Sequence, residues 1–392
     1  MSNFQVLIQE IFISEHPNAD RLEIGNIGSP EGWPVVVGKG LYKTGDLVAY
    51  VGENSLIPEN VLKKYKFWNE EKQKGLLAGS KGDRVRGCKL RDVFSMGICI
   101  PVKEVTLGYS DEDHIVNIAY ELEDEYVQEG EDVAELLGIT KYEAPIPTQM
   151  AGEVFNAGTL IGVNYDINDL KNYPEVLQEG EDVQISTKIH GTFCQIVITS
   201  NPNIVTDDWF KVGNNWITLS SKGMGAKGLF LKDNEKNNDN LYIRATKQYF
   251  VQLSDFLSRI EHEIITIAGE VFGSGVQDLN YGFKTNQTGF RLFDVYLGYR
   301  GVGDYVDDDQ VDIFCSNTNI PRVPLLYRGP YNKETVFNLA NAPEDSFPNC
   351  KHIREGIVIK PIKERRHEIL GRVVLKTRSI AYLSRKGGSE YN

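Results

Sequence analysis

Lys188 stands where an apolar, β-branched run gives way to a turn, in the stretch Ile185-Ser186-Thr187-Lys188-Ile189-His190-Gly191. A strand that ends in Lys-x-His-Gly delivers one amine into a turn, and the glycine lets a bulky ligand approach the backbone. An amine attacks only when it is deprotonated, so a reactive lysine needs nearby positive charge and partial burial to lower its pKa from about 10.4. The stretch therefore indicates a covalent nucleophile, while a solvated lysine at a strand end is the alternative that it leaves open.

Two glutamates further along the chain lie in equally unusual places. Glu270 and Glu355 each stand beside a glycine within an apolar run that predicts a strand. A carboxylate in such a place costs free energy unless it has a partner or a purpose. Because Mg²⁺ keeps most of its water and accepts one or two carboxylates, we expect Glu355 to anchor this metal, with Mn²⁺ as an alternative.

The elements that must position these residues begin with a small β module in residues 1–102. Short apolar runs alternate with turn signals and predict a five-stranded OB-type barrel. The predicted strands are Val6–Ile13, Arg21–Ile27, Pro34–Val37, Asp46–Val51 and Gly97–Pro101. A basic turn that could contact phosphates follows the fourth run and consists of Lys81, Arg84, Arg86, Lys89 and Arg91. A structural barrel whose loop charges are merely solvated is the alternative.

Residues 103–151 carry a different composition and predict an acidic linker. From Glu104 to Thr140 there are twelve Asp or Glu and no Lys or Arg, and the spacing of Asp132–Gly138 predicts one short helix closed by glycine. The net charge of −13 argues against a nucleic-acid partner, but eleven Lys or Arg against three Asp or Glu between Lys351 and Lys386 reverse that inference. The C-terminal part is therefore basic, which favours an anionic partner.

Composition narrows the class of protein further. The 392 residues are enough for two or three domains, and they contain neither an apolar run of membrane-spanning length nor a secretory signal. We therefore expect a soluble cytoplasmic protein that acts as a monomer. Five cysteines without a CxxC pair suggest neither disulfides nor a zinc site, and we expect them to be buried thiols.

Five segments follow the lysine in a fixed order, and together with it they carry a family resemblance. They are Ser220–Gly223, Ala268–Gly273, Gly289–Val295, Arg354–Pro361 and Arg372–Arg378. This ordered set resembles the covalent nucleotidyltransferases, the superfamily of ATP-dependent ligases and capping enzymes, over residues 152–392. His190 in Lys-x-His-Gly and a barrel that precedes the catalytic domain are similar to RNA ligases that seal nicks. His16–Leu22, with Lys89–Arg91 and Ser95–Gly97, resembles OB modules that bind tRNA beside aminoacyl-tRNA synthetases.

The resemblance implies an α+β protein, in which the OB-like barrel is followed by an adenylation domain of antiparallel sheets with flanking helices. It implies an ATP-dependent RNA ligase that joins 3′-hydroxyl and 5′-phosphate ends, in the repair of nicks or breaks in RNA. Lys188 would form lysyl-AMP, and the cations expected at the α-phosphate are Lys360, Lys376 and Arg378. Glu270 would bind the ribose hydroxyls, and Phe290 would stack on adenine. The remaining ATP contacts implied are Thr187, Ile189, His190 and Lys222.

Two departures from the family pattern concern the adenine contacts. Thr187 precedes the lysine where relatives commonly have Glu, and Phe193 stands where they commonly have Asn. The alternatives that remain open are a DNA ligase, a capping-type nucleotidyltransferase and a noncatalytic RNA-binding protein of the same fold. A Schiff-base enzyme is a further alternative, although no phosphate-binding glycine loop lies near Lys188.

Overall fold

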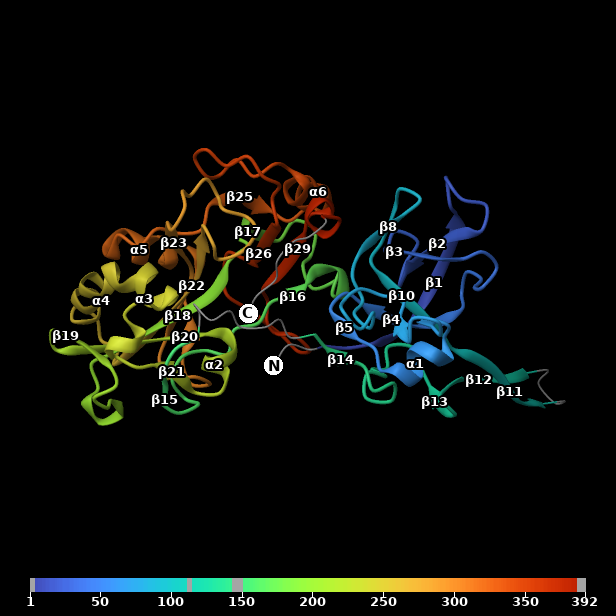
Figure 1. Ribbon diagram of the computed structural model, residues 1–392, viewed down its shortest axis with the longest axis horizontal. Coiled ribbons are helices and arrows are strands. Elements are labelled where there is room, and N and C mark those ends of the chain that lie inside the picture. The colour runs from blue at the N-terminus through green and yellow to red at the C-terminus, as the bar shows by residue number, and fades with distance from the viewer. Residues whose placement is uncertain (1–3, 111–114, 143–150, 386–392) are drawn as a thin grey trace. The chain divides into compact units, whose positions relative to one another are not determined.

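The computed structural model describes residues 4–110, 115–142 and 151–385, which form two compact units, residues 4–142 and residues 151–385 (Figure 1). The first unit is built on an antiparallel sheet with the strand order β10–β4–β1–β2–β3. Val36 N–H donates to Ser95 Oγ at 3.0 Å and Met96 N–H donates to Pro34 O at 2.9 Å, so hydrogen bonds link the two edges. The strands are β1 (Leu7–Glu15), β2 (Leu22–Ile27), β3 (Trp33–Gly38), β4 (Leu47–Gly52) and β10 (Gly97–Pro101). The predicted five-stranded barrel is confirmed.

Strand β4 is buried on both of its faces. Val48 and Tyr50 pack inside the barrel with Ile11, whereas Ala49 and Val51 pack on the other side with Leu62 of helix α1 (Glu59–Lys64). Alternate side chains of a strand point to opposite faces, so an uninterrupted apolar run is what a strand buried on both faces requires.

The acidic segment 103–142 differs from the linker that we expected. It forms a three-stranded antiparallel sheet of β11 (Lys103–Ser110), β12 (Ile115–Leu122) and β13 (Glu125–Val127), and its β14 (Thr140–Lys141) pairs with β5 (Ser55–Leu56). The apolar residues of this segment complete the core outside the barrel and are Leu122, Val127, Val133, Leu137 and Ile139. Instead of the predicted helix, Asp132–Gly138 forms hydrogen-bonded turns. Burial of these few apolar side chains makes the segment part of the first unit despite its charge.

Short elements complete the first unit. They are β6 (Trp68–Asn69) paired with β7 (Lys74–Gly75), and β8 (Cys88–Leu90) paired with β9 (Val93–Ser95). Cys88 on β8 is exposed, so the expectation of buried thiols fails there, while Cys99 and Cys194 are buried and all five cysteines are free.

The second unit contains two larger sheets. The first has the strand order β16–β29–β26–β17–β25 and consists of β16 (Asn168–Asp169), β17 (Asp182–Lys188), β25 (Leu325–Pro330), β26 (Gly356–Pro361) and β29 (Leu375–Arg378). The second has the order β19–β20–β18–β22–β23–β24 and consists of β18 (Thr192–Thr199), β19 (Phe210–Val212), β20 (Asn215–Ser221), β22 (Ile264–Gly273), β23 (Thr288–Leu297) and β24 (Asp304–Tyr305). All pairings are antiparallel except β16 with β29. Shorter pairs are β15 (Val154–Asn156) with β21 (Leu229–Leu231) and β27 (Arg366–His367) with β28 (Gly371–Arg372).

Helices cover these sheets, as the α+β prediction required. Phe250 of α4 and Phe314 of α5 pack in one cluster with Ile196 of the six-stranded sheet, while Val336 of α6 packs with Ile185 of the other sheet (Figure 1). The helices are α2 (Lys222–Ala226), α3 (Leu241–Thr246), α4 (Phe250–Leu257), α5 (Asp308–Thr318), α6 (Lys333–Asn341) and α7 (Ile380–Leu383). In the described parts of the chain, no helix has both the length and the apolar character needed to cross a bilayer.

Candidate active site

A turn of three residues carries the chain from one sheet of the second unit to the other. Strand β17 ends at Lys188 in the five-stranded sheet, and β18 begins at Thr192 in the six-stranded sheet. Gly191 within the turn lies so close to β22 that an added Cβ would be 2.2 Å from the carbonyl oxygen of Val271. Only glycine permits this approach. Because Gly191 holds the turn against β22, it also fixes the position of Lys188 at the start of the turn.

Lys188 meets the predicted metal carboxylate directly. Its Nζ lies 2.7 Å from Glu355 Oε1, because β17 pairs with β26 in a register that sets Lys188 opposite Gly356. The Glu355 side chain is only 5% exposed. Its other oxygen, Oε2, is buried and has no hydrogen-bond partner in the described part of the chain. The site thus holds one neutralised carboxylate oxygen and one open acceptor.

Glu270 enters the same site from the six-stranded sheet. Its pKa is raised to about 8, chiefly by burial and also by the negative charge of Glu355, although Lys188, the Gly191 N–H and Lys222 act in the opposite direction. The carboxyl group is therefore largely protonated at neutral pH and can donate as well as accept a hydrogen bond.

Three further cations, Lys222, Lys376 and Arg378, lie in this site. Burial, followed by the charge of Arg378, lowers the pKa of Lys376 to about 7, and Lys188 and Lys222 contribute to the decrease. Asp169 accepts from Arg378 at 3.3 Å, and Asp166 accepts from Lys222 at 2.8 Å. Lys222, Lys376 and Arg378 are therefore gathered as we expected, and burial together with the neighbouring positive charges lowers the pKa of Lys376.

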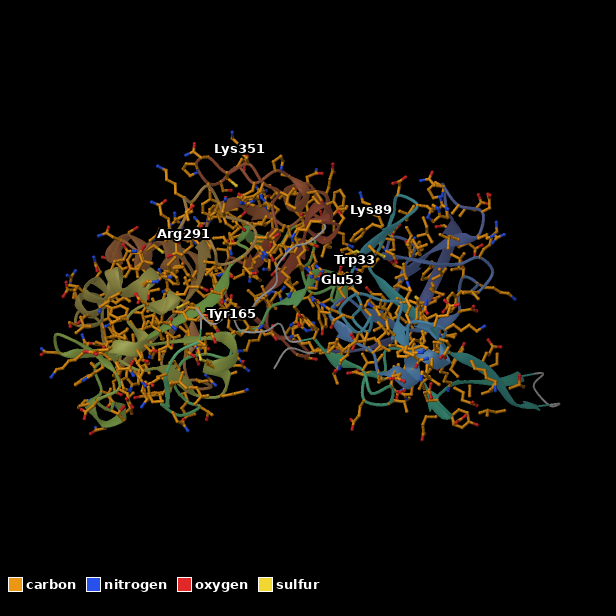
Figure 2. The ribbon with its side chains drawn as sticks, viewed as in Figure 1. Trp33, Glu53, Lys89, Tyr165, Arg291 and Lys351 are labelled. Carbon is orange, nitrogen blue, oxygen red and sulfur yellow. The ribbon has the colours of Figure 1, made fainter. Side chains whose placement is uncertain are left out.

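Lys360 has a different place from the one expected. Its Nζ donates to Asp294 Oδ1 at 2.5 Å and to the Phe293 carbonyl at 3.2 Å, and its side chain is only 4% exposed. Arg372 donates to both oxygens of the same Asp294, and the hydroxyl of Tyr165 (labelled in Figure 2) donates to Oδ2 at 2.5 Å. Lys360 therefore neutralises a buried carboxylate, and the structure does not leave it available to a phosphate.

Phe290, which we expected to stack on adenine, is also placed elsewhere. It is fully buried in the core beneath the sheet, where its ring packs over Gly269 and lies 6.2 Å from the ring of Tyr249. The ring on the opposite face of β23 is Phe293, which is half-buried and lies 6.1 Å from Phe193. Because Phe193 pairs with Glu270 in the register of β18 and β22, Phe293 lies on the face of the carboxylate. Phe290 therefore does not lie on the face of the sheet that carries Glu270, whereas Phe293 does.

Thr187, Ile189 and His190, which surround Lys188 in the sequence, are all buried. The Thr187 hydroxyl donates to Glu344 at 2.7 Å, and Ile189 packs in an apolar cluster with Phe272. These two side chains are committed to the protein interior, so any nucleotide contact from them has to use the backbone.

The ring of His190 bridges two partners close to the site. Its Nε2 lies 2.7 Å from Asp278 Oδ1, and its Nδ1 lies 3.1 Å from the Tyr382 hydroxyl and 4.0 Å from Glu355 Oε1. Although burial acts to raise the pKa of Asp278, the hydrogen bonds from His190 and Arg385 hold it well below its usual value. The histidine therefore lies beside Glu355, and hydrogen bonds connect its ring to Asp278 and Tyr382.

Three comparisons place this geometry among known proteins. An RNA ligase family model matches residues 181–378, and an OB-fold domain model matches residues 6–102. The chain belongs to the RNA ligase family. No curated protein matches the chain.

Solved structures of a Naegleria gruberi RNA ligase share the fold of this family member. A variant with ATP and Mn and another with AMP and Mn each have a TM-score of 0.68 and 23% identity, covering 97% of this chain and 98% of theirs. The same ligase with pyrophosphate has a TM-score of 0.67 and 22% identity, covering 97% of both chains. The likeness therefore extends over both units of the chain.

The donor set of this RNA ligase chain fits a divalent ion bound mainly by water and phosphate. In the residues that the structure describes, no group of three or more His, Cys, Asp or Glu side chains could hold a metal. The open Oε2 of buried Glu355 supplies one carboxylate oxygen, and Mg²⁺ needs no more than one or two. Glu355 remains the residue that we expect to hold the ion.

The basic turn of the barrel is only partly available to nucleic acid. Arg84 is buried, donates to Asn54 at 2.5 Å and stacks 3.6 Å from the centre of the Tyr142 ring, so it serves the unit's interior. Lys81, Lys89 and Arg91 are exposed, and Lys89 projects from the β8–β9 hairpin (Figure 2), whereas Arg86 is half-buried. His16 Nε2 and the Leu90 carbonyl lie 3.1 Å apart, which joins the two stretches that resembled tRNA-binding modules.

Sequence reasoning missed the carboxylates that hold the cations in place. Asp294 lies in an apolar strand, as Glu270 does, although no glycine adjoins it, and it is fully buried. Asp166, Asp169 and Asp278 lie in loops or at element ends, where an acidic residue is ordinary. No local signal distinguishes these three.

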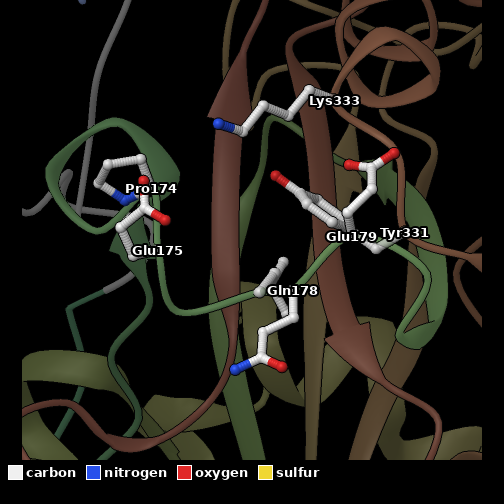
Figure 3. A pocket seen from close by; sticks show the side chains of 7 residues that line it. Pro174, Glu175, Gln178, Glu179, Tyr331 and Lys333 are labelled. Atoms are coloured by element: carbon white, nitrogen blue, oxygen red, sulfur yellow. The ribbon is translucent and has the colours of Figure 1, made fainter. Parts of the chain in front are cut away.

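A separate hollow of about 500 Å³ lies at the second unit's surface, between Pro174, Glu175, Glu179, Tyr331 and Lys333 (Figure 3). It contains none of the residues that surround Lys188. Its lining mixes both signs of charge and offers a nucleotide no group of cations.

Proposed function

We propose that this chain is an ATP- and divalent-metal-dependent RNA ligase that joins 3′-hydroxyl and 5′-phosphate ends through a lysyl-AMP intermediate. The observation that carries the proposal is the contact of Lys188 with Glu355, within a group of carboxylates and cations, in a member of the RNA ligase family. In the Naegleria ligase, the bound molecules include ATP, AMP and pyrophosphate. These are the substrate, the transferred group and the leaving group of the proposed first step.

In that step Lys188 Nζ forms a bond to the α-phosphorus of ATP as the bond to the pyrophosphate oxygen breaks. Lys222, Lys376 and Arg378 would neutralise the phosphate oxygens, and because Asp166 and Asp169 already hold Lys222 and Arg378 in place, the reorganisation of these two costs little. A divalent ion at Glu355 would supply further positive charge, which stabilises the charge on the phosphate.

The adenosine would be bound on the six-stranded sheet. Glu270 carries a carboxyl group that can accept from or donate to the ribose hydroxyls, and Phe293 presents a ring on the same face. This arrangement supports stacking of adenine on Phe293 rather than on Phe290. His190 would act from behind, because its ring is held by Asp278 and Tyr382 and lies 4.0 Å from Glu355.

The later steps would use the same cations, with Lys188 as the leaving group of the second step and without Lys188 in the third. AMP passes from Lys188 to the 5′-phosphate of an RNA strand, and the 3′-hydroxyl then displaces AMP to form the phosphodiester. We propose that the substrate is a nick or break in RNA and that the exposed cations of the first unit, Lys81, Lys89 and Arg91, contact its backbone.

Incubation of the protein with α-labelled ATP or GTP and Mg²⁺, followed by nicked duplexes with RNA or DNA on each side, tests the proposal. We expect an acid-stable adduct with ATP that requires Lys188, and sealing when RNA forms the 3′-hydroxyl side. Lys188→Ala should form no adduct yet still join a pre-adenylylated strand at a reduced rate, because that step does not need the amine. An adduct that persists in Lys188→Ala, or one that forms with GTP alone, would refute the assignment.

A further inference from the structure

A buried carboxylate that the proposed mechanism does not use lies behind the nucleophile. Glu344 follows helix α6, and its side chain is 0% exposed. Its Oε2 accepts from the Thr187 hydroxyl at 2.7 Å and lies 3.5 Å from Arg354 Nε, while its Oε1 accepts from Ser346 N–H at 3.1 Å. A charge removed from water to this degree is retained only with such partners.

Arg354 is equally buried and ties Glu344 to its surroundings. Its side chain is 2% exposed, and it donates to the Leu339 carbonyl at 2.8 Å and to Asp345 Oδ1 at 3.0 Å. Its own carbonyl accepts from the Ser379 hydroxyl at 2.6 Å. The guanidinium is therefore fixed to α6 and to the loop that follows it, and the Arg354 backbone is fixed to Ser379, which precedes α7.

The two partners of Glu344, Thr187 and Arg354, are sequence neighbours of the residues proposed to act on ATP. Thr187 immediately precedes Lys188, and Arg354 immediately precedes Glu355. Successive side chains of a strand point to opposite faces, so a grip on Thr187 from one face fixes the direction in which Lys188 leaves the other. Glu344 thus holds both residues that stand next to the 2.7 Å contact between Lys188 and Glu355.

We propose that Glu344, through Thr187 and Arg354, is a positioning residue that sets the nucleophile and the metal-binding carboxylate relative to each other. The proposal rests on the proposed function for its catalytic consequence. A displacement of about 1 Å in a reacting group can cost a factor of about 10² in rate, and side chains locked from behind prevent such a displacement.

The two arms of the cluster make different predictions for the two chemical steps. Thr187→Val removes only the link to Lys188, so it should slow adenylylation about tenfold and leave the joining of pre-adenylylated RNA within about twofold. Glu344→Gln loosens both arms, so it should slow both steps by about tenfold or more. Asp345→Asn is the matched control, because Asp345 binds the same guanidinium but is 81% exposed, and both rates should stay near those of the unchanged protein.

A second measurement needs neither ATP nor metal. Reductive methylation of the metal-free protein, followed by peptide mass spectrometry, reports the reactivity of Lys188, whose side chain is 21% exposed. We expect methylation of Lys188 to be several times faster in Thr187→Val and Glu344→Gln and unchanged in Asp345→Asn.

Thermal melting shows whether each variant folds. If Glu344→Gln does not fold, Thr187→Val is used alone for the test. Unchanged Lys188 methylation in a folded Thr187→Val protein, or equal loss of both steps in that variant, would overturn the inference. Absence of any adduct in the unchanged protein would refute the proposed function instead, because the methylation test does not depend on it.

Discussion

Lys188 Nζ and Glu355 Oε1 lie 2.7 Å apart, although 167 positions separate the two residues in the sequence. The register of β17 and β26 creates this contact, since it places Lys188 opposite Gly356. The proposed nucleophile therefore ends β17, and the expected metal ligand immediately precedes β26 in the same sheet.

Replacement of Glu355 by glutamine keeps the shape of the side chain and removes its charge. We expect Glu355→Gln to lower the adenylylation rate by about 10² or more, as for the loss of a preorganised electrostatic contact. Single-turnover formation of the labelled adduct at saturating Mg²⁺ measures the effect. Glu368→Gln, at an exposed position, is the control and should be unaffected. Adduct formation near the original rate in Glu355→Gln would remove this residue from its role.

The stability of the protein should depend on the protonation of Glu270. Its folded pKa of about 8 lies above the ordinary value of 4.5, so its contribution to stability is full below pH 4.5 and is lost as the pH rises through 8. Glu270→Gln does not titrate and should flatten this loss, on the order of 1–3 kcal/mol. Urea unfolding of both proteins in EDTA at pH 5 to 8.5 measures the difference. Parallel stability profiles would show that the carboxyl group is ionised in the folded protein.

The two phenylalanines of β23 should give opposite phenotypes. Phe293→Leu should raise the KM for ATP about tenfold by removing a stacking surface, with little effect on melting. Phe290→Leu should lower the melting temperature by disturbing a fully buried core position and leave the KM nearly unchanged. A raised KM in Phe290→Leu alone would restore the original assignment.

The Asp294 cluster should be a large contributor to stability. Asp294→Ala leaves Lys360 and Arg372 buried without their shared carboxylate, which should cost about 3–5 kcal/mol of unfolding free energy. Asp304→Asn, at a carboxylate that is 86% exposed, should cost almost nothing. Denaturant unfolding of both variants decides the matter, and equal costs would contradict the structural role given to Asp294.

Much of the fold follows from local patterns in the sequence. The five strands of the barrel were predictable because apolar runs and turns alternate there. The position of Lys188 at the end of a strand was predictable because an apolar run is followed by a Lys-x-His-Gly turn. The segment 103–142 was misjudged because twelve acidic residues conceal the few apolar side chains, such as Leu122 and Val133, that fix it to the first unit. Net charge describes the exposed face of such a segment, whereas its placement depends on the buried one.

The sites of Phe290 and Lys360 could not be predicted for a different reason. Which face of β23 a residue occupies depends on its pairing with β22, and that pairing shifts between Ala268 and Gly269. A shift of one residue exchanges the two faces, and no residue in β23 itself reveals it. Likewise, the buried partner of Lys360 comes from a strand 66 positions away.

The three-residue turn at Gly191 divides the proposed nucleotide site between two sheets. Lys188, Glu355 and the cations Lys376 and Arg378 belong to the five-stranded sheet or its ends, whereas Glu270 and Phe293 belong to the six-stranded sheet. A small rotation of one sheet against the other would leave the Lys188–Glu355 distance unchanged and alter the span from Lys188 to Glu270. The phosphate and the sugar of a bound nucleotide would then connect the two sheets. An adenylate attached to Lys188 would fix the angle between the sheets.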